Sequence, residues 1–97
     1  MAKERRITWS PSALQDLKDA FEFISADRPK AAHEFLGRIV NQIGKLARFP
    51  QLGRTIPEVG KSRYRELIVG EYRIFHEVSE KEVLIFRIIH SRQSFRH

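Results

Sequence analysis

The basic residues of the second half of the sequence are the first candidates for chemistry. Five arginines fall in segments that read as β-strands or at their ends, namely Arg63, Arg65, Arg73, Arg87 and Arg92. Charged side chains are few in a sheet with a buried face. A guanidinium group is planar and always charged, so it suits phosphate oxygens. Antiparallel neighbours could bring Arg65, Arg73 and Arg92 together on the exposed side of a sheet, which predicts a phosphate-binding surface.

These arginines also have a structural alternative. Four glutamates in the same half of the chain could form ion pairs with them, namely Glu58, Glu66, Glu71 and Glu77. Ion pairs inside the sheet would leave no guanidinium group free for a phosphate. For Arg73 and Arg92 we favour the functional interpretation, because of a family resemblance given below.

Acid–base chemistry would need a second kind of residue. Cleavage of RNA by its 2′-OH needs a proton acceptor, a proton donor and stabilisation of the charged phosphorane. The sequence has four histidines without metal-ligand spacing, at positions 33, 76, 90 and 97. His90 directly follows the last predicted strand, so it could act there, with Glu66 or His76 as a partner.

Most other enzyme signatures are absent from the sequence. It contains no Gly-rich phosphate loop, no His-Glu-x-x-His and no Gly-x-Ser-x-Gly. It contains no cysteine, which excludes disulfides and thiolate catalysis and fits a reducing cytoplasm. No residue pattern implies a cofactor or a metal ion.

The first half of the chain predicts a strand and a helical hairpin. Residues 6–9 alternate in polarity and contain β-formers, and Ser10-Pro11 is a typical helix start. Two apolar stripes at helical spacing then run from about residue 11 to 47, interrupted before Pro29. Together they predict an αα-hairpin. Gly37 and Gly44 lie inside the second helix, where we expect them to permit close approach to a neighbour.

The second half predicts a small sheet. Residues 49–62 are rich in Pro and Gly and predict an irregular stretch. Residues 64–69, 72–78 and 83–89 are rich in β-branched and aromatic residues, with gaps of hairpin length between them. The expected fold is therefore α+β: an N-terminal strand, an αα-hairpin, and a three-stranded antiparallel meander packed on the helices. The other face of the meander would meet solvent or a partner.

Length and composition limit the kind of protein. With 97 residues, the sequence is expected to form one domain over 1–97. A formal net charge of +6 favours anionic partners such as nucleic acid. No apolar stretch has the length of a membrane span, and no apolar run follows the basic N-terminus, so we expect neither a membrane partner nor a signal peptide.

The order of motifs resembles the RelE/ParE superfamily of bacterial toxins. The N-terminal half contributes Trp9-Ser10-Pro11, Ala13-x-x-x-Leu17, Ala31-Ala32 with Phe35 and Ile39, and Phe49-Pro50-x-x-Gly53-Arg54. The C-terminal half contributes Tyr64-Arg65-Glu66-Leu67, Gly70-x-Tyr72-Arg73-Ile74 and Ile88-Ile89-His90-x-Arg92. Each motif is weak alone, but the ordered set covers nearly the whole chain.

The resemblance implies a growth-inhibiting toxin of a type II toxin–antitoxin system, of the kind that stabilises plasmids. It implies a cognate antitoxin as partner in a toxin–antitoxin hetero-oligomer, and action in the cytoplasm. Its target would be DNA gyrase in the ParE-like branch, or mRNA on the ribosome in the RelE-like branch. The Pro-x-x-Gly-Arg stretch and the long regular hairpin resemble the ParE-like branch more closely.

Residue by residue, the RelE-like ribonucleases place an arginine at Arg73, an arginine at Arg92 and often a lysine at Arg65. They have a second basic residue where this chain has Leu67, and a terminal tyrosine for which Phe95, which cannot exchange a proton, is the nearest aromatic here. Two hypotheses follow. The first is a ParE-like inhibitor that contacts gyrase through target-binding residues, namely Arg65, Arg73, Arg87, Arg92 and Tyr72. The second, which the resemblance to the RelE-like branch implies, is a ribosome-dependent endoribonuclease with His90, Arg73, Arg92 and Arg65 as its catalytic residues.

Overall fold

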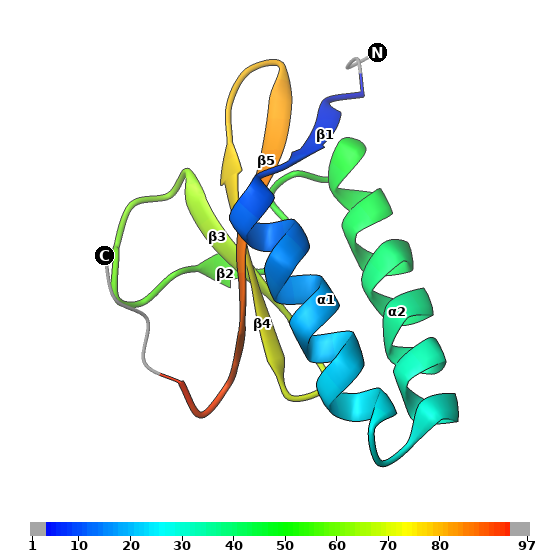
Figure 1. Cartoon of the computed structure of the whole chain (residues 1–97). Coiled ribbons are helices and arrows are strands. Elements are labelled where there is room, and N and C mark those ends of the chain that lie inside the picture. The colour runs from blue at the N-terminus through cyan, green and yellow to red at the C-terminus, as the bar shows by residue number, and fades with distance from the viewer. Residues whose placement is uncertain (1–3, 94–97) are drawn as a thin grey trace.

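The chain folds as two helices on one face of a five-stranded mixed sheet (Figure 1). The computed structural model describes residues 4–93. The elements in chain order are β1 (Arg6–Trp9), α1 (Pro11–Ser25), α2 (Pro29–Gly44), the 3-10 turn η1 (Lys45–Ala47), β2 (Arg54–Thr55), β3 (Tyr64–Val69), β4 (Tyr72–Val78) and β5 (Glu82–His90). The predicted α+β architecture is confirmed. No helix among these residues is long and apolar enough to cross a membrane.

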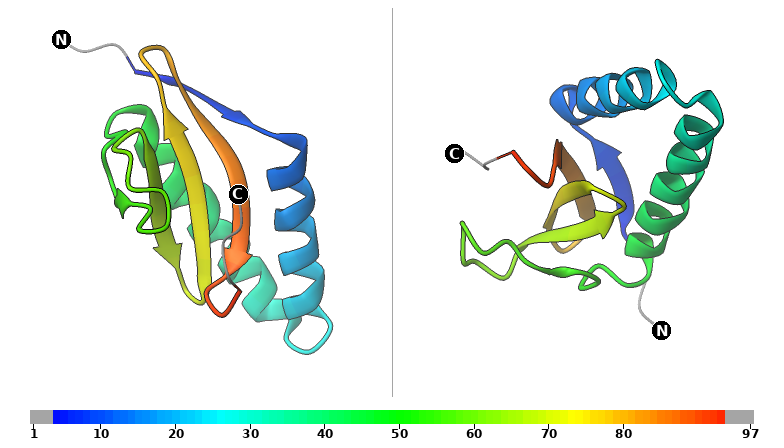
Figure 2. Two further views of the ribbon diagram at one scale, coloured as in Figure 1. Left: turned by 90° about the vertical axis from the view of Figure 1, so that its left-hand side faces the viewer. Right: turned by 90° about the horizontal axis from the view of Figure 1, so that it is seen from below.

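The helical hairpin forms for the local reasons that the sequence gives. The hydroxyl of Ser10 accepts a hydrogen bond from the backbone N–H of Ala13 at 3.0 Å, which caps the start of α1, and Pro11 occupies the first turn. Pro29 begins α2 in the same way. Leu17 and Ile24 of α1 and Ile39 of α2 pack on the core between the helices and the sheet, whereas Leu14 is 53% exposed. The two helices form one layer beside the sheet (Figure 2).

The sheet has the order β1-β5-β4-β3-β2. Strands β3, β4 and β5 form the predicted antiparallel meander, and the turn at Gly70-Glu71 sets its register by pairing Val69 with Tyr72. Two pairings extend it. β1 runs parallel to β5 and pairs with its first half, and the two-residue strand β2 pairs with β3. The three-stranded meander is thus the centre of a larger sheet, and β2 lies in a stretch expected to be irregular throughout.

Apolar side chains pack on both faces of the sheet. The main core lies between the helices and the sheet and includes Phe35, Ile39 and Ile74. A second, smaller core lies on the opposite face, where the segment between β2 and β3 folds over the strands and buries Ile56 completely against Phe75. The helix-free face is therefore partly covered by the chain itself, whereas the sequence suggested a face open to solvent or a partner.

β1 pairs only with the first half of β5, so the second half has one free edge, opposite to β4. Side chains form hydrogen bonds with backbone groups on this edge. The carboxylate of Asp16, on α1, accepts hydrogen bonds from the backbone N–H of Ile88 at 2.8 Å and from Nε of Arg87 at 3.0 Å. The side-chain oxygen of Gln93 accepts from the N–H of His90. Unpaired edge groups invite pairing with other chains, so these side chains protect the edge.

The expectation for the two helical glycines is wrong. A Cβ atom built at Gly37 or Gly44 would meet nothing within 4 Å, so neither glycine permits a close approach. We expect Gly37→Ala to raise the free energy of unfolding by about 0.5–1 kcal/mol, because alanine restricts the unfolded chain and fits a helix. Urea denaturation of both proteins measures this difference. A destabilised variant would show that the position has a constraint that its open surroundings do not explain.

Candidate functional site

The three arginines expected to converge do not meet. The register pairs Arg65 with His76 and Ile68 with Arg73, so Arg65 and Arg73 lie on opposite faces of the sheet. Arg65 shares the helix-covered face with Leu67 and Ile74, whereas Arg73 shares the other face with Phe75. The prediction of one phosphate-binding surface made by Arg65, Arg73 and Arg92 is therefore wrong. The physical reason is that successive side chains of a strand point to opposite faces of the sheet. Residues in pairs that are an odd number of steps apart therefore lie on opposite faces.

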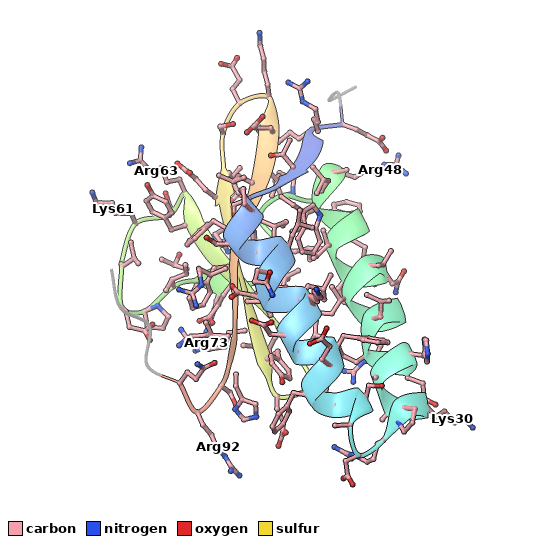
Figure 3. The ribbon with its side chains drawn as sticks, viewed as in Figure 1. Lys30, Arg48, Lys61, Arg63, Arg73 and Arg92 are labelled. Atoms are coloured by element: carbon pink, nitrogen blue, oxygen red, sulfur yellow. The ribbon has the colours of Figure 1, made fainter. Side chains whose placement is uncertain are left out.

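Arg73 is the centre of a buried ion-pair network. Its Nε donates to Glu66 at 2.6 Å, and its two terminal nitrogens bind both carboxylate oxygens of Glu58, at 2.8 and 2.9 Å. Glu66 is completely buried and also accepts from Nε of Arg54 at 2.9 Å. The guanidinium group of Arg73 lies over the ring of Phe75 and its side chain is 10% exposed. Figure 3 shows Arg73 inside the fold, between the sheet and the loop that covers it.

The charges of this network are fixed by their partners. Hydrogen bonds from Arg73 lower the pKa of Glu58 to about 2, and hydrogen bonds to Glu58 and Glu66 raise the pKa of Arg73. Four of the five N–H groups of the Arg73 guanidinium group donate to carboxylates. A phosphate that bound Arg73 with two hydrogen bonds would have to displace one of these carboxylates. The structural alternative of ion pairing with Glu58 and Glu66 therefore holds for Arg73, and the functional interpretation favoured from the sequence is not supported for it.

Arg65 is held by the chain that follows the second helix. One terminal nitrogen donates to the carbonyl of Gly53 at 3.0 Å and the other to the hydroxyl of Thr55 at 3.4 Å. Its Nε is buried without a hydrogen-bond partner, as is Nδ1 of His76 across the strand pair. Arg65 thus holds β2 and the loop before it against β3. A contact between Arg65 and a target would compete with these hydrogen bonds.

His76 lies in the interior, so it cannot assist His90. It is completely buried, and its Nε2 lies 3.4 Å from the carbonyl of Pro50. Desolvation by this burial lowers the pKa of His76 to about 4, and the nearby charge of Arg65 acts in the same direction. The ring is therefore neutral at physiological pH, and its place on the helix-covered face separates it from Arg73.

We expect acid to destabilise the fold through His76. The unfolded chain binds a proton at this ring below its ordinary pKa of 6.5, whereas the folded chain does so only near pH 4. Stability is therefore lost as the pH falls through this window, by about 2 kcal/mol between pH 7 and pH 5. The variant His76→Gln, which does not titrate, should lose much less over the same interval in urea denaturation. Equal losses in both proteins would assign the acid sensitivity to other groups.

His90 sits at the end of β5 with both ring nitrogens engaged. Its Nδ1 accepts a hydrogen bond from the backbone N–H of Arg92 at 3.1 Å, which places the proton on Nε2. Nε2 lies 3.4 Å from a carboxylate oxygen of Glu71, and the ring packs edge-on against Tyr72. A general base needs a free nitrogen lone pair near its substrate. In this arrangement His90 has none, and its strand partner is Tyr72 rather than Arg73.

The remaining predicted residues have different surroundings. Arg92 is exposed, and its side chain forms no hydrogen bond or ion pair within residues 4–93. Arg87 is paired with Asp16 at 3.0 Å. Tyr72 packs against Phe35 and His90, and burial raises the pKa of its hydroxyl. Glu66 belongs to the Arg73 network, so it is not available for proton transfer. Phe95 lies outside the described residues.

Two adjoining hollows are the clearest concave surfaces. One, of about 610 Å³, lies between the α1–α2 turn and the β3–β4 turn, and the other, of about 540 Å³, lies between α1 and the free edge of β5. Phe23, Tyr72 and His90 line both. Phe23 is 75% exposed and was missed by the sequence reasoning, although a large apolar residue outside the stripe of α1 was a usable signal.

Several solved structures have a fold similar to that of this chain. The chromosomal ParDE toxin–antitoxin system from P. aeruginosa gives a TM-score of 0.74 at 22% identity, with 90% of this chain and 96% of that chain covered. The RelBE2 toxin–antitoxin complex from Mycobacterium tuberculosis gives 0.62 at 16% identity, covering 93% and 94%. The RelB–RelE antitoxin–toxin complex from Methanococcus jannaschii gives 0.61 at 21% identity, covering 88% and 91%. These similarities show the fold.

A helical hairpin on a mixed sheet is thus the fold that this chain shares with these solved structures. The chain belongs to the ParE toxin family of the type II toxin–antitoxin system parDE, whose family model matches residues 7–95. No curated protein matches the sequence.

Proposed function

We propose that this toxin inhibits DNA gyrase by contact, breaks no bond itself, and is neutralised by a cognate antitoxin in the cytoplasm. The observation that carries the proposal is the state of Arg73. In a ribonuclease of this superfamily, an arginine at this position would face the phosphate, but here two glutamates hold it inside the fold. A contact inhibitor needs no such free group, since its affinity comes from buried apolar and arginine anchors.

The hollows beside α1 support a protein partner. They are lined by aromatic side chains, and Phe23 stands exposed between them. Exposed aromatic residues at a concave surface are typical anchors for another protein. The solved structures with this fold are complexes of toxins with antitoxins, which supports an antitoxin as one such partner. Of the predicted target-binding residues, Arg92 is exposed and Arg65, Tyr72 and Arg87 are half-buried, whereas Arg73 is buried.

The alternative is a ribosome-dependent endoribonuclease, which the fold shared with RelE-type toxins favours. It would require Glu58 to leave Arg73 and His90 to release the N–H of Arg92. Arg65 would also have to leave Gly53 and reach the other face of the sheet. Such a rearrangement of several contacts makes the contact inhibitor the better-supported function.

The deciding experiment expresses the toxin from a tightly controlled promoter and follows DNA and protein synthesis over the first minutes. An early fall in DNA synthesis, with inhibition of gyrase supercoiling by the purified toxin, is expected. An early fall in protein synthesis with mRNA cut at codon positions, and no effect on gyrase, would replace this proposal by the ribonuclease.

We expect His90→Ala to keep toxicity within about tenfold of the wild type, because it removes one contact and no proton transfer. A ribonuclease that used His90 as base would lose about a hundredfold or more. The level of toxin expression that halves the growth rate measures the effect under both hypotheses. The matched control is His33→Ala on α2, which removes a histidine that packs on Phe21, away from both hollows.

A further inference from the structure

Positive charge is not spread evenly over the molecule. The helical hairpin holds five acidic side chains (Asp16, Asp19, Glu22, Asp27 and Glu34) against four basic ones (Lys18, Arg28, Lys30 and Arg38). The net charge of the whole chain is nevertheless +6. The whole excess therefore lies outside the hairpin, on the sheet, its loops and the chain ends. This excess includes Lys45 and Arg48 at the end of α2 as well as the cations of the loop between β2 and β3, and such an excess favours an anionic partner.

Among residues 4–93, five cations of the sheet and its loops are exposed and form no ion pair, namely Arg6, Lys61, Arg63, Lys81 and Arg92. Of these, Lys61 and Arg63 belong to the loop between β2 and β3, and Arg92 follows β5. None forms an ion pair within residues 4–93, and Arg63 only lies over the ring of Tyr64, at 5.0 Å. In Figure 3 all three project away from α2, on the side opposite to Lys30 and Arg48. We call Lys61, Arg63 and Arg92 the loop-side cations.

The acidic groups of this region do not cancel them. Glu58 and Glu66 are bound to Arg73, and Glu71 lies against His90. Glu77 is half-buried opposite Tyr64 in the sheet. The loop-side cations thus remain uncompensated because the neighbouring carboxylates already have partners or lie within the sheet.

We propose that the loop-side cations bind the phosphate backbone of duplex DNA. Proteins that bind single-stranded nucleic acid offer free aromatic rings on which unpaired bases stack. Among residues 4–93, the rings on the helix-free face of the sheet are engaged: Tyr64 packs on Phe86, which packs on Phe75 in the second core. Cations without a stacking platform fit the phosphates of a paired duplex, where sequence is not read.

The test measures binding of the purified toxin to a fluorescent duplex of about 20 base pairs as salt is raised from about 50 to about 200 mM. The double variant Lys61→Glu/Arg63→Glu should bind about tenfold or more weakly. Its slope of log affinity against log salt should fall by about two, because each lost phosphate contact contributes about 0.9.

The matched control is Lys18→Glu/Lys30→Glu, which makes the same change in net charge on the helical hairpin, at exposed residues without ion pairs within residues 4–93. We expect it to stay within about threefold of the wild type, since charges farther than a Debye length are screened. If Arg63→Glu unfolds the protein, the single variant Lys61→Glu takes its place, with an expected fall in slope of about one.

Three results would overturn the proposal. The wild type could show no salt-dependent binding to the duplex. Both double variants could lose the same affinity, which would report net charge rather than a surface. Single-stranded RNA of the same length could bind more tightly than the duplex. The measurement contains no gyrase, so its failure leaves the proposed inhibition of gyrase standing, and failure to inhibit gyrase leaves the DNA-binding result standing.

Discussion

Replacing Arg73 by alanine is expected to lower the free energy of unfolding by about 3–5 kcal/mol, the range for breaking a buried ion pair by removing one partner. The reason is what the substitution leaves behind. Glu66 is completely buried and would keep only the hydrogen bond from Arg54, whose side chain is 62% exposed. Glu58 would lose both of its contacts to the guanidinium group. The segment that covers the helix-free face would thereby lose this attachment to the sheet.

Chemical denaturation of the two proteins measures this loss directly. The control removes both buried charges together in Arg73→Met/Glu66→Leu, which leaves no carboxylate unpaired inside the fold. Replacing a buried ion pair by apolar residues of similar size is often nearly neutral, so this variant should be clearly more stable than Arg73→Ala. If the single variant loses less than about 1 kcal/mol, the pair is effectively solvated, and the argument that Arg73 is unavailable to a phosphate would weaken with it.

The substitution Gly53→Ala is expected to cost about 3 kcal/mol or more. Two effects combine at this position. Gly53 has a φ angle of +84°, which residues other than glycine rarely adopt. A Cβ atom there would also overlap the backbone carbonyl of Glu66. The obstacle is backbone in the sheet, so no rotamer change can relieve it. The variant should also weaken the pairing of Arg54 with Glu66 that forms β2.

A substitution at Gly60 serves as the control that distinguishes the effect of backbone conformation from the effect of atomic overlap. It has φ +73°, but a Cβ atom built there meets nothing within 4 Å. Gly60→Ala should therefore cost only the conformational part, about 1 kcal/mol. Thermal unfolding of both variants under one condition gives the comparison. Similar losses in the two would show that the overlap at Gly53 is relieved by a shift of the loop, and that backbone conformation alone explains its cost.

The elements were predictable because each depends on local pattern. The helix start at Ser10-Pro11, the interruption before Pro29 and the three strand segments of the meander are all confirmed. The partner of β1 was not predictable in this way, since it pairs with a strand more than seventy residues away. β2 is two residues long, too short for an alternating pattern.

The failure to place the arginines has a more specific cause. The turn at Gly70-Glu71 pairs Val69 with Tyr72, and counting outward from that pair puts Arg65 opposite His76, on the face that excludes Arg73. This result was available from the hairpin spacing in the sequence. The partners of Arg73 were less accessible, because Glu58 reaches it from an irregular loop whose path no periodicity describes.

The place of β5 in the sheet has a consequence for biosynthesis. β5 comes last among the described strands, yet it lies between β1 and β4 and is hydrogen-bonded to both. A chain that emerges from the ribosome starting at its N-terminus therefore holds β1 without a partner until β5 is available. Contacts so distant along the chain also slow folding. The toxin is thus expected to become folded only after β5 has been synthesised, and a fragment that stops before Glu82 would lack the strand that joins β1 to β4.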